Sequence, residues 1–143
     1  MSTPTSDPHT TTIRVRYSET DRMGFVYYAN YLVYFEIGRT EQLRASGIRY
    51  RDLEDQGYTL AVAEAHVKYA SPARYDETLT IATSLVEVTH VRLRHEYEIT
   101  GEDGRRVAGG HTVLACLGRD GKPCRLPPEV ARLAVARSPS ARG

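Results

Sequence analysis

Residues 17–31 read Tyr17-Ser-Glu-Thr-Asp21-Arg-Met-Gly24-Phe-Val-Tyr-Tyr28-Ala-Asn30-Tyr31. A strand-like run over residues 13–17 leads to one acidic residue, Asp21, and Asn30 opens an amphipathic helix. Asparagine is a preferred N-cap, because its side chain accepts from the first free N–H groups of a helix. The pattern therefore predicts a carboxylate a few residues before a helix N-terminus, where unpaired N–H groups favour negative charge. Attack on a carbonyl requires a carboxylate that faces an electropositive donor site of this kind.

Two interpretations of this stretch stay open on the residues alone. Asp21 also fits a loop aspartate that caps a turn before Gly24. The tyrosines that cluster here fit core or interface aromatics, but rings with one hydroxyl also suit an apolar acyl pocket with a few polar anchors. These tyrosines are Tyr17, Tyr27, Tyr28, Tyr31 and Tyr34.

The rest of the chain predicts an α+β domain. A helix from Asn30 to about Ser46 is apolar on most sides of its first half, which indicates a buried helix, and Gly47 ends it. Alternating apolar and polar residues then predict four mainly antiparallel strands. We expect these strands at residues 59–69, 78–87, 91–99 and 106–117, a last helix at 128–137, and disordered tails at 1–11 and 138–143. The small residues Ala61, Ala63 and Ala65, with Gly109 or Gly110, are expected to let the sheet curl round the helix.

Composition excludes several classes of function. The 143 residues carry a net charge of +1, which gives no electrostatic footprint for nucleic acid or an anionic membrane. No apolar run approaches the roughly 20 residues of a membrane span. The first residues lack the apolar segment of a signal peptide, so we expect a cytoplasmic protein. No metal-ligand spacing, nucleophile elbow, P-loop or dinucleotide fingerprint is present, and we expect neither a metal nor a cofactor.

The motif Tyr17-x-Glu-Thr-Asp21-x-x-Gly24-x-Val26-Tyr-Tyr28-x-Asn30-Tyr31 resembles the signature of the hotdog-fold thioesterases of the 4-hydroxybenzoyl-CoA thioesterase family. It is most similar to the branch that includes the Tol-Pal-associated acyl-CoA thioesterase. A second stretch, Val67-x-Tyr69-x-x-Pro72-Ala-Arg74-Tyr-Asp76-Glu-x-Leu79, is also similar to that branch, and the likeness covers roughly residues 12 to 130. The resemblance implies one hotdog domain over residues 12–137, a five-stranded antiparallel sheet wrapped around one long helix. It also implies homodimers or homotetramers with active sites between subunits.

The resemblance also implies roles for individual residues in acyl-CoA hydrolysis. Asp21 matches the catalytic aspartate, which acts as nucleophile or as general base on water. Tyr28 matches the position whose backbone N–H polarises the thioester carbonyl, although some relatives carry histidine there. Thr89 and His90 stand where the aromatic-substrate branch has phosphate-binding arginines, and Arg92 is a possible replacement. The remaining expected substrate contacts are Tyr17, Gly24, Val26, Asn30, Tyr31 and Glu64.

Other functions remain possible at this point. An acyl-carrier-protein thioesterase keeps the fold and changes only the carrier. A non-catalytic acyl-thioester-binding protein belongs to another class, because hotdog domains are reused widely. Asp21 argues against a pure binder, which needs no carboxylate facing a thioester. The sequence leaves the acyl group open.

Overall fold

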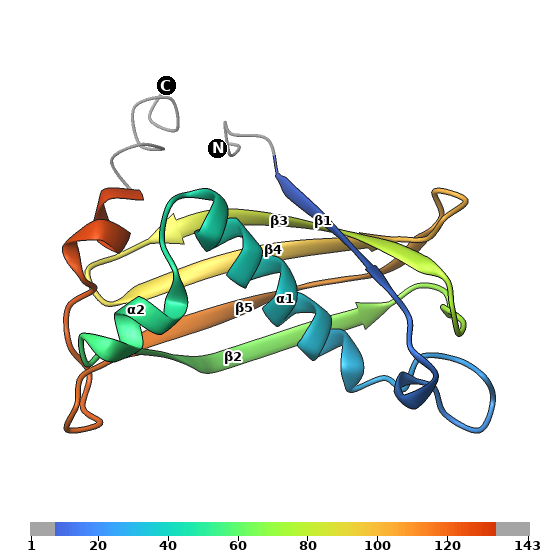
Figure 1. Ribbon diagram of the computed structural model, residues 1–143, viewed down its shortest axis with the longest axis horizontal. Coiled ribbons are helices and arrows are strands. Elements are labelled where there is room, and N and C mark those ends of the chain that lie inside the picture. The colour runs from blue at the N-terminus through green and yellow to red at the C-terminus, as the bar shows by residue number, and fades with distance from the viewer. Residues whose placement is uncertain (1–7, 134–143) are drawn as a thin grey trace.

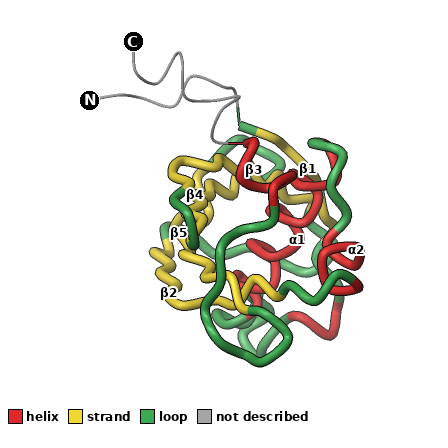
Figure 2. The backbone as a smooth tube through the Cα atoms, turned by 90° about the vertical axis from the view of Figure 1, so that its left-hand side faces the viewer, coloured by secondary structure: helices red, strands yellow, loops and turns green. Residues whose placement is uncertain are grey.

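The computed structural model describes residues 8–133. They form one five-stranded antiparallel sheet, and the helices α1 and α2 lie on its inner side (Figure 1). The strand order is β1-β3-β4-β5-β2, so β1 and β2 are the two edges. The bounds are β1 His9–Arg14, α1 Asn30–Ala45, α2 Tyr50–Asp55, β2 Thr59–Tyr69, β3 Thr78–Val88, β4 Arg92–Thr100 and β5 Arg106–Leu117. The sheet curves around α1 when it is viewed from the side (Figure 2). The predicted hotdog architecture is confirmed.

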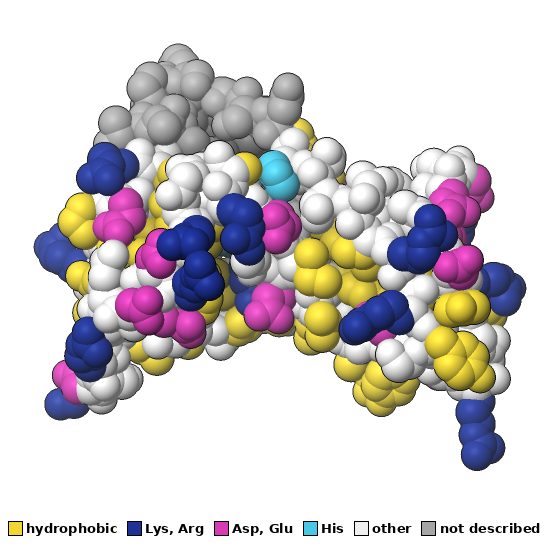
Figure 3. Space-filling model, viewed as in Figure 1, with side chains coloured by type: hydrophobic (Ala, Val, Ile, Leu, Met, Phe, Trp, Pro, Cys, Tyr) yellow, Lys and Arg dark blue, Asp and Glu magenta, His cyan; other side chains and the backbone are white. Residues whose placement is uncertain are grey.

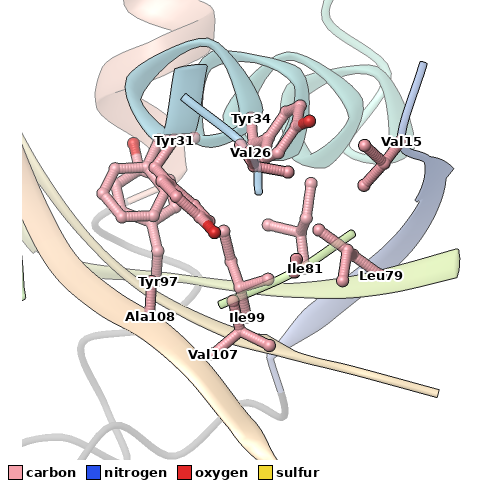
Figure 4. Close-up of a cluster of buried hydrophobic side chains, with 12 residues drawn as sticks. Val15, Val26, Tyr31, Tyr34, Leu79, Ile81, Tyr97, Ile99, Val107 and Ala108 are labelled. Atoms are coloured by element: carbon pink, nitrogen blue, oxygen red, sulfur yellow. The ribbon is translucent and has the colours of Figure 1, made fainter. Parts of the chain in front are cut away.

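The apolar face of each inner strand packs against α1. In β3 and β4, buried and less buried residues alternate along nearly the whole strand, as their sequence patterns predict. The helix side chains Tyr31 and Tyr34 face Ile81 and Ile99 of the sheet (Figure 4), and all four are buried. This cluster fixes the first half of α1 on the sheet.

The helix is not buried all round, which corrects the sequence prediction. Tyr34 and Phe35 are buried, but Leu32 and Val33 are 40% and 46% exposed. The two neighbours share one side of the helix that points away from the sheet. The first half of α1 therefore has an apolar face that the described part of the chain leaves exposed.

Gly110 of β5 leaves room for the backbone of the neighbouring strand β2 and for one ring of α1. A Cβ atom at this position would overlap the backbone carbonyl of His66 on β2, and it would lie 3.1 Å from the Phe35 ring. The small-residue prediction therefore holds for Gly110. It fails for Ala63 and Ala65, which are exposed on the outer edge strand.

The ends of the domain differ from the sequence prediction. β1 begins at His9 and pairs with β3, so residues 9–11 belong to the sheet and not to a disordered tail. The strand stops at Arg14, and a 3-10 turn, Tyr17–Glu19, follows it. Residues 128–133 are helical as expected. The rest of that predicted helix and the predicted tail at 138–143 lie outside the described residues, as do residues 1–7.

Glu19 ties the loop before α1 to the helix. Its carboxylate, 13% exposed, accepts hydrogen bonds from the Tyr34 hydroxyl at 2.9 Å and from the Arg16 backbone at 2.9 Å. Its carbonyl accepts from the Tyr27 N–H at 2.8 Å and from the Asn30 side chain at 2.9 Å. The cap residue of α1 is Ala29, so Asn30 braces the loop and does not cap the helix as predicted.

These contacts shift the ionisation of both partners. Burial alone would raise the pKa of Glu19, but the hydrogen bonds from Arg16 and Tyr34 outweigh it and hold the pKa below its ordinary value. Burial and the adjacent Glu19 carboxylate raise the pKa of Tyr34, so its hydroxyl remains a donor.

Substitution of Gly110 tests the close packing of β5 against the β2 backbone and the Phe35 ring. We expect Gly110→Ala to lower the free energy of unfolding by about 3 kcal/mol, because backbone must move to admit the methyl group. Gly118→Ala is the matched control, since its Cβ would meet only ordinary contacts at 3.5 Å and beyond. Its expected cost is below about 0.5 kcal/mol. Equal urea midpoints for the two variants would contradict this packing.

The Glu19 contacts predict a pH-dependent stability. Because the folded-state pKa of Glu19 is depressed, its contribution is present above the unfolded pKa of about 4.3 and is lost as the pH falls through the folded value. We expect Glu19→Gln to cost about 2 kcal/mol at pH 7, and the difference from wild type should shrink below about pH 4. The exposed carboxylate Glu41, paired with Arg44, is the control, and Glu41→Gln should change little. A Glu19→Gln deficit that is constant from pH 7 to pH 3 would exclude the ionised carboxylate as its source.

Candidate active site

Asp21 sits in a tight turn that presents it to solvent. Its Oδ1 accepts from the backbone N–H groups of Met23 at 2.9 Å and Phe25 at 3.3 Å. The Asp21 N–H donates to the Phe25 carbonyl at 2.8 Å, and Gly24 adopts a positive φ of 83° that closes the turn. The turn-capping interpretation is thus correct for Oδ1. Among the described residues, no group donates to Oδ2, so this oxygen is available to a ligand.

The start of α1 offers backbone donors. The Tyr27 carbonyl accepts from the Asn30 N–H at 2.9 Å, and the Tyr28 carbonyl accepts from the Tyr31 N–H at 3.4 Å. The N–H groups of Tyr28 and Ala29 donate to no acceptor within residues 8–133. Free N–H groups of this kind, at the positive end of the helix dipole, stabilise an anion.

One open cleft of about 470 Å³ contains both features. Its walls come from the Asp21 turn, the start of α1 and the end of β2, and most of them are aromatic or apolar. On the face shown in Figure 3, hydrophobic side chains gather over the half of the molecule where α1 begins. The lining residues are Asp21, Met23, Phe25, Val26, Tyr27, Tyr28, Tyr31, Tyr69, Ala70, Ser71 and Pro72.

Two phenols that line the cleft, Tyr31 and Tyr69, have a raised pKa and are neutral donors at physiological pH. Burial raises the pKa of Tyr31 to about 12. Burial, with the neighbouring Tyr28, also raises the pKa of Tyr69. The Tyr31 ring contacts the Tyr69 ring edge to face, with centroids 5.4 Å apart. The cleft therefore combines aromatic walls with protonated hydroxyl groups.

The structure brings together four of the predicted site residues. Asp21, Val26, Tyr28 and Tyr31 all line the cleft. Gly24 does not line it and acts through the shape of the turn. Two further predicted contacts also lie outside its lining, Asn30 and Tyr17.

Tyr17 contacts Tyr75 and does not line the cleft. Its side chain is 78% exposed and meets the Tyr75 ring edge to face, at a centroid distance of 5.6 Å. Tyr17 is not among the residues that line the cleft, and its predicted substrate contact stays a prediction.

The predicted phosphate contacts lie at the other end of the sheet. Thr89 follows the last residue of β3. Across the sheet, Ile81 of β3 is in register with Tyr69, which lines the cleft. Thr89 lies roughly 26 Å along β3 from Ile81. Thr89 accepts from the Arg92 N–H at 3.0 Å and so closes the turn between β3 and β4. A second cavity of about 510 Å³ adjoins this turn and includes His90. One chain cannot place Thr89, His90 or Arg92 against a small group bound beside Asp21.

Glu64 is also separate from the cleft. It lies exposed on the edge strand β2, at the point where a bulge shifts the pairing with β5. Its side chain is directed to solvent or to another molecule.

The prediction missed the wall that comes from the end of β2. Tyr69, Ser71 and Pro72 lie about 50 residues after Asp21 and reach its turn only through the fold. A signal was available, because Tyr69 and Pro72 belong to the second stretch that resembles the thioesterase branch.

Two features are absent from the part of the chain that the structure describes. Within residues 8–133, no three His, Cys, Asp or Glu side chains lie close enough to hold a metal ion. No helix in that range has the length and apolarity needed to cross a membrane.

Comparisons with known proteins agree with the geometry. Residues 15–133 match the family described as the thioesterase-like superfamily. A protein of Bacillus subtilis named putative acyl-CoA thioesterase YneP is 38% identical over 108 residues, which are 76% of this chain and 78% of the relative. The acyl-CoA thioesterase YbgC of Haemophilus influenzae is 32% identical over 121 residues, 82% of this chain and 88% of that protein.

Solved structures show the same likeness. The DHNA-CoA thioesterase of Staphylococcus aureus superposes with a TM-score of 0.80 at 36% sequence identity, covering 82% of this chain and 79% of its own. The match of the family model covers well over half of the 143 residues. With its hotdog fold and the cleft at the start of α1, the chain belongs to the thioesterase-like superfamily.

Proposed function

We propose that this protein is an acyl-CoA thioesterase that hydrolyses an acyl-CoA to a free acid and CoA. The relatives named acyl-CoA thioesterases support the reaction class. The observation that carries the proposal is one apolar cleft that contains both a carboxylate with a free oxygen and a helix start with unpaired N–H groups. No cofactor is part of this proposal.

The reaction follows from these two groups. The Asp21 carboxylate either attacks the thioester carbon, forming an anhydride that water cleaves, or removes a proton from the attacking water. The carbonyl oxygen gains negative charge in either route, and the Tyr28 N–H stabilises it at the helix N-terminus. Collapse of the intermediate breaks the C–S bond and expels CoA as the thiolate. Hydrogen bonds from Met23 and Phe25 hold Asp21 in one orientation while its other oxygen reacts.

Two alternatives and two finer assignments accompany this proposal. An acyl-carrier-protein thioesterase would use the same cleft, and a non-catalytic acyl-thioester-binding protein would use it without turnover. Membership of the Tol-Pal-associated branch and the cytoplasmic location remain predictions. A panel of acyl-CoAs, from short aliphatic to aromatic, with thiol release as readout, separates the enzyme from the binder and defines the acyl group.

We also propose that the protein works as a homodimer or homotetramer. β2 is an edge strand whose outer side has no neighbouring strand within residues 8–133, and most of its side chains are exposed. Antiparallel pairing of β2 with its copy would place the start of the partner's β2 beside the end of this one. The end of the partner's sheet that is far from its own cleft would then approach this cleft. Thr89, His90 and Arg92 lie at that end of the sheet, so they could serve the substrate only across the interface. The exposed apolar side of α1 gives a further surface for a tetramer.

Replacement of Asp21 tests the proposed mechanism. Asp21→Asn keeps the size and the turn-capping acceptor but removes the charge, so kcat should fall on the order of 100-fold or more. Asp120→Asn is the matched control, since Asp120 caps a distant turn by accepting from the Lys122 N–H at 3.0 Å. Hydrolysis of acyl-CoA by purified wild type and both variants gives the comparison. An Asp21→Asn enzyme with more than about half of the wild-type kcat removes Asp21 from the mechanism.

A charge on the edge strand tests the proposed assembly. We expect Ala65→Lys to weaken self-association, because an edge lysine opposes strand pairing, and to lower activity with it. Glu87→Lys introduces lysine at an exposed position of the inner strand β3 and should leave the oligomer intact. Light scattering coupled to gel filtration reports the mass. A fully active wild-type monomer of 16.0 kDa would disprove the proposed assembly.

A further inference from the structure

Tyr69 joins the end of the edge strand to the start of α1. It is the last residue of β2, and its hydroxyl donates to the Tyr28 carbonyl at 3.0 Å. Its ring contacts Tyr28, just before α1, with centroids 6.5 Å apart, and Tyr31 in α1, with centroids 5.4 Å apart. Nothing in the sequence pattern assigns this contact, because the two residues are 41 positions apart.

This hydrogen bond acts on the residue that carries the proposed oxyanion donor. The other bond to the Tyr28 carbonyl comes from the Tyr31 N–H and is long, at 3.4 Å. On the preceding peptide, the Asn30 N–H holds the Tyr27 carbonyl at 2.9 Å. The peptide groups on both sides of the Tyr28 Cα are therefore fixed, the first by the helix and the second chiefly by Tyr69. Without the phenol, only the long bond from the Tyr31 N–H would hold the second peptide.

We propose that Tyr69 is a positioning residue that holds the peptide between Tyr28 and Ala29, so that the Ala29 N–H points at the developing oxyanion beside the Tyr28 N–H. This inference rests on the proposed thioesterase activity and adds a residue to it. An oxyanion donor is effective only when it already points at the site where charge develops, since reorientation during the reaction costs free energy. A hydrogen bond to the carbonyl also polarises the adjoining amide, which strengthens the Ala29 N–H as a donor. The raised pKa of Tyr69 keeps its hydroxyl protonated at the pH of an assay.

Tyr69→Phe tests the proposal because it keeps the ring contacts and removes only the hydroxyl. We expect kcat to fall about tenfold with KM within twofold, since a misaligned donor weakens the transition state more than the bound substrate. Tyr75→Phe is the matched control, because Tyr75 is an exposed tyrosine whose ring meets Tyr17 outside the cleft. It should leave kcat and KM unchanged.

A second readout separates positioning from a general structural role. In the wild-type protein labelled with 13C and 15N, the hydrogen bond deshields the Tyr28 carbonyl carbon, so Tyr69→Phe should move that signal upfield. The melting temperature should stay within a few degrees of wild type. The ring remains, so Tyr69→Phe should fold, and Tyr69→Trp offers a second hydroxyl-free aromatic if it does not.

Four results would overturn the proposal while wild type remains active. They are an unchanged kcat, a raised KM alone, a fall in kcat without a shift of the Tyr28 carbonyl, and a fall that only follows lost stability. Failure of the wild-type protein to hydrolyse any acyl-CoA in the panel would instead reject the thioesterase activity itself. The two failures are thus distinguishable.

Discussion

The partly buried carboxylate of Glu19 is the interaction on which the geometry of the site depends. It binds the Tyr34 hydroxyl of α1 and the backbone of Arg16, while its own carbonyl holds Tyr27 and Asn30. A carboxylate in this position is stable only because several donors replace its lost hydration. The bonds span both ends of the loop that contains Asp21. Loss of the network would free that loop from the helix, and the carboxylate and the N–H donors would no longer share one cleft.

The curved sheet gives the network a rigid support. Stacking of Phe35 on Tyr97, with centroids 4.2 Å apart, and the missing side chain at Gly110 bring α1 close to the strands. The helix start then meets the end of β2, an edge strand. A site at the edge of a sheet is open to a long substrate and adjacent to a possible partner subunit. In our account, the same strand serves self-association and, through Tyr69, the orientation of the helix start.

Periodicity predicted most of the fold, because strands with one buried face must alternate. The bounds expected for β2 and β5 agree with the structure, and those of β3 and β4 differ by one residue. Alternation could not show which face of the edge strand meets the helix, and the alanines of β2 were therefore misplaced. The exposed Leu32 and Val33 were misjudged for a related reason, since an apolar side chain has the same pattern in a core and in an interface.

The site was predictable only where it is local in sequence. Asp21, Val26, Tyr28 and Tyr31 follow one another closely, and the resemblance to thioesterases identified them. The Asn30 side chain was predicted to accept from helix N–H groups, but it donates to the Glu19 carbonyl, which becomes a neighbour only when the loop folds back. Thr89 and His90 were placed by analogy, and strand register puts them at the opposite end of the sheet from the cleft. Tyr69 illustrates the converse, a residue close in space whose role no local pattern reveals.

The central claim is that an acyl thioester binds between the Asp21 turn, the start of α1 and the end of β2. Titration of the labelled protein with a non-hydrolysable acyl-CoA thioether, followed by amide chemical shifts, tests it most directly. A parallel titration with CoA alone identifies the acyl-dependent shifts, which are those that only the thioether causes. Our account predicts that the largest acyl-dependent shifts fall within residues 21–31 and 69–72. Acyl-dependent shifts confined to the cavity beside Thr89 and His90 would contradict it.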